Sequence, residues 1–121
     1  MRQYVERQII RALIDAALFA SFLITVHNGE ETVLIKSRDA DAIMKEMFTT
    51  DDEMLYFYKS EAPKETFGWI KLVYGNSGPD VISDYTTNLE HLMKKPNAIS
   101  DYWDADGPWK EFDDGKVPNR P

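Results

Sequence analysis

Apolar residues recur at helical spacing over the first twenty positions of the chain. Charged residues such as Arg7, Arg11 and Asp15 fill the positions between them, and no glycine or proline interrupts the segment. A stripe of this width predicts a helix over residues 2–20 that is covered on most of its surface and forms the centre of the core. The apolar positions are Val5, Ile9, Ile10, Leu13, Ile14, Ala16, Ala17, Leu18 and Ala20.

Two short runs of β-branched and aromatic residues follow, at residues 22–26 and 32–36. They flank the dipeptide Asn28-Gly29, in which both residues tolerate the positive φ angles that tight hairpin turns require. The pattern predicts a first β-hairpin.

A second helical stripe comes after this hairpin, with Ser37 or Asp39 as its amino-terminal cap. An acidic run ends the stripe and is interpreted as a solvated loop. Runs at 54–59 and 66–74, on either side of a connection that contains Pro63, then predict the strands of a second hairpin. The apolar positions of the second stripe are Ala40, Ile43, Met44, Met47 and Phe48.

Residues 75–80 are dense in turn formers, and residues 81–85 form either a short extended piece or the entry to a third helix. A basic last turn at Lys94-Lys95, followed by Pro96, is typical of a helix that stops there. Tyr85, Leu89, Leu92 and Met93 share the apolar face of this predicted helix.

This order predicts a single α+β domain in which helix, hairpin, helix, hairpin and helix follow one another. The two hairpins form a four-stranded antiparallel sheet packed against the helices. We expect the α+β domain to comprise residues 1–96 and an acidic, aromatic C-terminal tail to comprise residues 97–121, because glycines and prolines prevent long regular elements in the tail.

Composition narrows the classes of function. The chain has no cysteine and only two histidines, so thiolate metal sites and cysteine nucleophiles are excluded, and no cofactor is expected. Its net charge of −7 disfavours direct binding to nucleic acid and suits a protein partner. The longest apolar stretch, residues 12–26, is interrupted by Asp15 and is too short for a membrane span, so we expect a soluble cytoplasmic protein without membrane contact.

The C-terminal tail combines aromatic and acidic residues, so it either covers its own domain or docks on a partner. As a docking segment it would use tryptophan anchors and carboxylates that steer association. The residues predicted to bind a partner are Trp103, Trp109, Tyr102, Phe112, Asp101, Asp104 and Asp106. Exposed aromatic residues of the sheet or the tail also leave self-association open.

A second acidic group surrounds the second predicted helix. It is interpreted either as an ordinary solvated face or as a negative strip that competes for a partner's phosphate-binding groove, in the manner of a nucleic-acid mimic. Its members are Asp39, Asp41, Glu46, Asp51, Asp52 and Glu53.

Catalytic motifs are lacking. The glycines near residue 75 do not have the spacing of a phosphate-binding loop, and Pro108 occupies a position that a calcium loop starting at Asp104 would need for a ligand. His91 lies off the apolar helical face and is interpreted as a solvated residue. The alternative is a small hydrolase-like enzyme that uses Asp80 and Asp84 with Asn76 in the turn region.

The stretch LVYGNSGPDVISDYTTNL at residues 72–89 resembles a segment of small uncharacterised proteins encoded by phages and prophages of proteobacteria. The opening stretch VERQIIRALI at residues 5–14 is also similar, so the resemblance covers residues 1–96. It implies no activity and no catalytic residue. The leading hypothesis is therefore a non-enzymatic interaction protein, an accessory factor of a mobile element that binds a host or phage protein.

Overall fold

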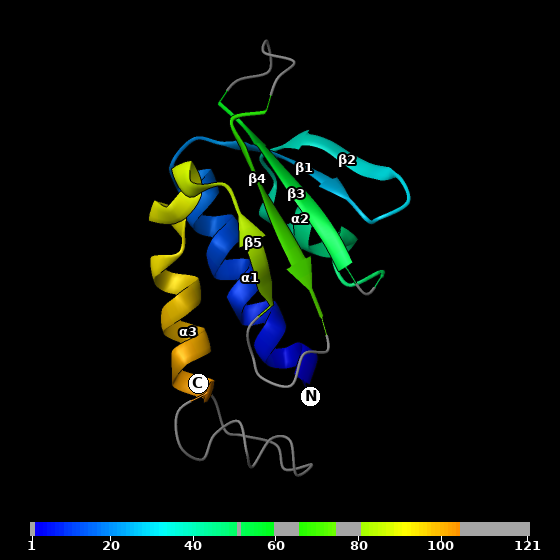
Figure 1. Cartoon of the computed structure of the whole chain (residues 1–121). Helices are drawn as coiled ribbons and strands as arrows, with labels where there is room; N and C mark the ends of the chain where they lie inside the picture. The colour runs from blue at the N-terminus through cyan, green and yellow to red at the C-terminus, as the bar shows by residue number, and fades with distance from the viewer. Residues whose placement is uncertain (1, 51, 60–65, 75–80, 105–121) are drawn as a thin grey trace.

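The computed structural model describes residues 2–50, 52–59, 66–74 and 81–104. It is an α+β domain in which helices lie on one face of an antiparallel sheet (Figure 1). In chain order the elements are α1 (Arg2–Phe19), β1 (Leu23–His27), β2 (Thr32–Ser37), α2 (Ala40–Glu46), β3 (Asp52–Tyr58), β4 (Gly68–Val73), β5 (Ile82–Tyr85), the 3-10 helix η1 (Thr87–Leu92) and α3 (Lys94–Asp104).

Both predicted hairpins are confirmed, and the first predicted helix is also present as α1. The turn between β1 and β2 is held by the Asn28 side chain, whose Oδ1 accepts hydrogen bonds from the backbone N–H groups of Glu30 and Glu31 at 2.9 Å. Gly29 in this turn has a φ angle of 96°, as the Asn-Gly signal requires. The hairpins join through β1 and β3, so the strand order is β2-β1-β3-β4-β5.

The four-stranded prediction is wrong by one strand. Residues Ile82–Tyr85 form β5, which pairs antiparallel with β4 and places Tyr85 opposite Ile70. A run of four residues is too short for a periodic pattern, and its strand conformation depends on pairing with a distant segment. Of the two alternatives predicted for residues 81–85, a short extended piece or the entry to a helix, the extended piece is present as β5.

The predicted end of the third helix at Pro96 is also wrong. Thr87–Leu92 forms a short 3-10 helix, and an α-helix then begins at Lys94 and continues to Asp104, across the position given to the domain boundary. Pro96 is the third residue of α3, where a backbone N–H has no acceptor within the helix. Pro96 therefore lies in the first turn of α3 and does not mark the end of a preceding helix.

The core lies between α1 and the sheet. Leu13 and Ile14 of α1 are fully buried, as are Phe57 of β3 and Ile70 of β4. α1 contacts α2 on one side and α3 on the other, and α3 runs in the opposite direction to α1 (Figure 1). α1 is thus the central helix of the layer, and its outer surface lies between two neighbouring helices.

Gly68 sets how closely η1 approaches the sheet. A Cβ atom at this position would lie 2.5 Å from Thr86 Oγ1 and 2.8 Å from Leu89 Cδ1. Such distances are shorter than van der Waals contact, so only glycine allows this packing. Gly68 therefore fixes the position of η1 and of the beginning of α3.

Candidate functional site

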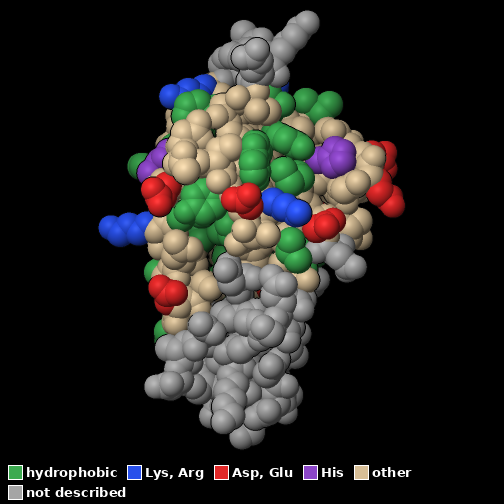
Figure 2. All heavy atoms as spheres, in the orientation of Figure 1, with side chains coloured by type: hydrophobic (Ala, Val, Ile, Leu, Met, Phe, Trp, Pro, Cys, Tyr) green, Lys and Arg blue, Asp and Glu red, His purple; other side chains and the backbone are tan. Residues whose placement is uncertain are grey.

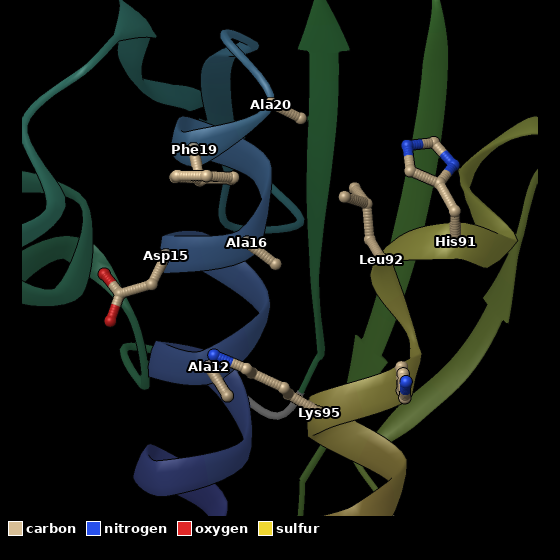
Figure 3. Close-up of a pocket in the computed structure, with 9 residues that line it drawn as sticks. Ala12, Asp15, Ala16, Phe19, Ala20, His91, Leu92 and Lys95 are labelled. Atoms are coloured by element: carbon tan, nitrogen blue, oxygen red, sulfur yellow. The ribbon is translucent and has the colours of Figure 1, made fainter.

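A groove of about 710 Å³ lies between α1 and the segment formed by η1 and the first turn of α3. Figure 3 shows Ala16 of α1, and Ala20 just after the end of α1, pointing toward this segment, with Leu92 facing them. The groove is lined by Ala12, Asp15, Ala16, Phe19, Ala20, His91, Leu92, Lys94 and Lys95.

The floor of the groove follows from the spacing of three alanines. Ala12, Ala16 and Ala20 are four residues apart, so those within α1 lie on one side of the helix and continue toward its end. Their side chains are one carbon long, which leaves space between the two helical segments. Leu92 is buried at 3% exposure and supplies an apolar wall. The floor is thus apolar, and its small side chains leave room for a side chain from another molecule.

The rim of the groove is basic on the α3 side. Lys94, Lys95 and His91 are exposed, and Figure 3 shows Lys95 extending across the gap toward α1. Within the described part of the chain, neither lysine forms an ion pair with a carboxylate. This rim therefore presents positive charge beside an apolar floor.

Asp15, on the α1 side of the groove, forms an ion pair with Arg11. The Nε atom of Arg11 donates to Asp15 at 3.0 Å, and its Nη1 atom donates to Asp41 of α2 at 3.1 Å. The hydrogen bond to Asp15, followed by that to Asp41, raises the pKa of the Arg11 guanidinium above its ordinary value. Asp15 points away from the groove in Figure 3, so the local charge is set by the α3 rim.

Exposed apolar side chains gather on this layer. Among the described residues, four large apolar side chains are exposed, and three of them, Tyr4, Phe19 and Tyr102, belong to α1 and α3. Phe19, at 93% exposure, lines the groove itself. A nearly free phenylalanine beside an apolar hollow is typical of a surface that another molecule covers.

A second hollow of about 640 Å³ continues along the outer surface of α1 toward α2. It shares Ala12 and Asp15 with the groove, so the two are adjacent. Arg7 lies in this hollow with its guanidinium 4.6 Å from the centre of the Phe48 ring, an arrangement that fixes the cation in place.

The structure brings part of the predicted docking segment to this layer. Asp101 and Tyr102 are exposed on α3, whose first turn lines the groove. Trp103 and Asp104 belong to α3 by their backbone, but their side chains lie outside the described residues, as do Asp106, Trp109 and Phe112.

The acidic group around α2 is not a single surface. Asp39 caps α2 through hydrogen bonds from the backbone N–H groups of Asp41 and Ala42, which confirms its predicted capping role. Asp41 and Asp52 are exposed, Glu46 is half-buried, and Asp51 lies outside the described residues.

The assignment of Glu53 to this solvated surface is wrong, because Glu53 belongs to β3 and is only 1% exposed. Its carboxylate accepts hydrogen bonds from the backbone N–H groups of Phe48 and Thr49 at 3.0 Å and from the hydroxyl of Tyr74. The prediction of a solvated loop at residues 51–53 is also wrong for its last two residues, because β3 begins at Asp52. The burial of this glutamate has no signal within the acidic run, because its hydrogen-bond partners lie outside that run.

The residues of the enzymatic alternative are only partly visible. Asn76 and Asp80 lie outside the described residues, and Asp84 is exposed on β5 with its Oδ1 atom accepting from the backbone N–H of Tyr85. His91 is exposed, as predicted, although it lies on η1 and at the groove. Within the described ranges, no group of three histidine, aspartate or glutamate side chains is placed to hold a metal ion.

Comparison of the chain with protein-family models, with curated proteins and with solved structures gave no match. Of the described helices, none combines the length and apolar character needed to cross a membrane.

Sequence reasoning missed the groove itself. It assigned Ala16 and Ala20 to the core stripe and Lys94 and Lys95 to a last helical turn. The available signal was the four-residue spacing of small residues on α1, but the wall opposite them is set by tertiary packing.

Proposed function

We propose that this chain is a non-enzymatic interaction protein that binds a partner protein through the groove between α1 and α3. The observation that carries the proposal is Phe19, a 93% exposed phenylalanine at an apolar groove with a basic rim. Large rigid apolar side chains that are exposed in the free protein are common anchors in interfaces.

The chemistry of the groove indicates the kind of segment that fits it. Its floor accepts an apolar side chain, and Lys94 and Lys95 favour carboxylates next to that side chain. An amphipathic helix or extended segment with apolar and acidic residues matches both features. Asp101 and Tyr102 extend the same helical layer, so the predicted docking segment would contribute to the same interface.

A role as an accessory factor of a mobile element rests on the sequence resemblance alone. The hydrolase-like alternative and the nucleic-acid mimic have less support: Asp84 lines neither the groove nor the hollow beside it, and the acidic residues around α2 form no continuous strip among the described residues.

Two substitutions test the proposal through quantitative affinity capture from native host cells. Ala20→Trp fills the exposed end of the groove, and Lys95→Glu reverses the charge of its rim. Ile35→Ala on β2, where the side chain is 71% exposed, is the matched control. We expect a partner that both groove variants lose and the control retains; equal capture by all three variants would contradict the proposal.

A further inference from the structure

The face of the sheet turned away from the helices carries its own set of apolar side chains. Because residues alternate between the two faces of a strand, positions 54, 56 and 58 of β3 lie opposite the buried positions 53, 55 and 57. Figure 2 shows apolar side chains gathered over β3 and β4, and no described helix covers them. None of Met54, Tyr56, Tyr58, Trp69 and Val73 belongs to the main core.

Two aromatic residues lie at the centre of this open face. Tyr56 of β3 pairs directly with Trp69 of β4, and β3 is the middle strand of the sheet. Both side chains are half-buried. Beside them the Tyr58 ring has the Lys36 ammonium group 4.7 Å from its centre. Tryptophan and tyrosine in the middle of a patch are the residue types that contribute most to protein interfaces.

The charges on the open face cancel. Lys71 and Lys36 supply two positive charges, and Asp52 and Asp84 supply two negative charges. The whole chain, by contrast, carries a net charge of −7. Two copies of this chain repel one another over most of their surface, so a neutral apolar face is where they can approach.

The size of the face also fits a second copy. Five strands at about 4.8 Å spacing, with about six residues each, cover roughly 24 Å by 20 Å. Two such faces together bury about 1,000 Å², close to the lower size of specific interfaces. An interface of this area predicts an association that depends on protein concentration.

We propose that the open face binds a second copy of the chain, so that two sheets pack face to face about a two-fold axis. The two-fold relation places the same patch on both sides, and Tyr56 and Trp69 lie near its centre. The helical layers then form the two outer surfaces of the dimer. This inference goes beyond the proposed function, and each copy would keep its groove accessible.

Sedimentation equilibrium over a wide range of protein concentration tests the proposal. We expect the full chain to change from monomer to dimer as concentration rises, and Trp69→Asp to raise the dissociation constant by about 30-fold or more. Tyr56→Asp is a second variant in case the first does not fold, with circular dichroism as the check of folding.

Two controls separate this face from the others. Asn97→Asp introduces the same charge at an exposed position of α3, and Ala20→Asp introduces it at the groove; both should leave the dissociation constant unchanged. A chain that is monomeric at every concentration overturns the proposal. So does a dimer that persists in both open-face variants, or one that Ala20→Asp disrupts.

Discussion

The hydroxyl of Tyr74 donates a 2.5 Å hydrogen bond to the Oε1 atom of Glu53, a carboxylate that is 1% exposed. The same carboxylate accepts from the backbone of Phe48, a residue with a φ angle of 67°, and from the backbone and hydroxyl of Thr49. Glu53 thus holds the turn after α2 in a conformation that a phenylalanine rarely adopts. Its role is structural, and the buried charge depends on every one of these donors.

Tyr74→Phe should lower the free energy of unfolding by about 1.5–3 kcal/mol, because it removes one donor to a buried charged group. The measurement is urea denaturation monitored by circular dichroism. Tyr58→Phe is the matched control: its ring is half-buried, and its hydroxyl forms no hydrogen bond within the described residues, so we expect a change within about 0.5 kcal/mol. Equal effects of the two substitutions would contradict the structural role of the pair.

Alkaline pH should weaken the fold through the same tyrosine. Burial, together with the hydrogen bond to Glu53, raises the pKa of the Tyr74 hydroxyl far above its ordinary value. The unfolded chain releases this proton at about pH 10 while the folded chain retains it, so the stabilisation is complete below about pH 10 and is lost as pH rises further. The loss approaches about 1.4 kcal/mol per pH unit.

Denaturation curves at a series of pH values above 9 measure this slope. The Tyr74→Phe variant should lose stability less steeply than the unchanged protein, because both proteins share every other titrating group. If the free energy of unfolding falls with pH at the same rate in both proteins, the prediction is wrong, because Tyr74 would then have the same pKa in the folded and unfolded chains.

Gly68→Ala should destabilise the fold by about 1–3 kcal/mol, because the added Cβ would overlap Thr86 and Leu89 and force η1 away from β4. The thermal midpoint measures the loss. Since η1 supplies Leu92 to the groove, the variant should also bind the groove partner more weakly at temperatures where it is still folded. An unchanged midpoint would contradict the close approach of η1 to the sheet.

Two deletions distinguish the tail from the last helix. Removing residues 105–121 leaves α3 intact, and we expect little change in thermal midpoint but weaker partner binding through the loss of Trp109 and Phe112. Removing residues 97–121 takes away most of α3, including Ile99, which packs against the core, so the midpoint should fall by several degrees. If the shorter deletion captures the same partner with unchanged affinity, the docking role of the tail is refuted.

Local patterns predicted the elements that carry their own signals. The α1 stripe, the Asn28-Gly29 turn and the Asp39 cap each depend on residues close together in sequence, and the structure contains all three. The β5 strand and the burial of Glu53 depend on partners far along the chain. The helix end predicted at Pro96 is wrong because a proline is compatible with a first helical turn as well as with a helix end.

The candidate site was predictable only in its parts. Asp101 and Tyr102 were singled out from composition, and the structure places them on the helix that lines the groove. The groove itself requires Gly68 to admit η1 and small side chains on α1 to face it. This relation between distant segments has no periodic signature in the sequence.

The most direct measurement is photo-crosslinking from the groove in native host cells. Benzoylphenylalanine in place of Phe19 puts a reactive aromatic group at the groove, and the same group in place of Ile35 puts it at another exposed position, on β2. The proposed function predicts a defined crosslinked protein from position 19 that is absent from position 35 and is lost when Lys95→Glu is added. Identical crosslinks from both positions, or a position 19 crosslink that Lys95→Glu leaves unchanged, would contradict it.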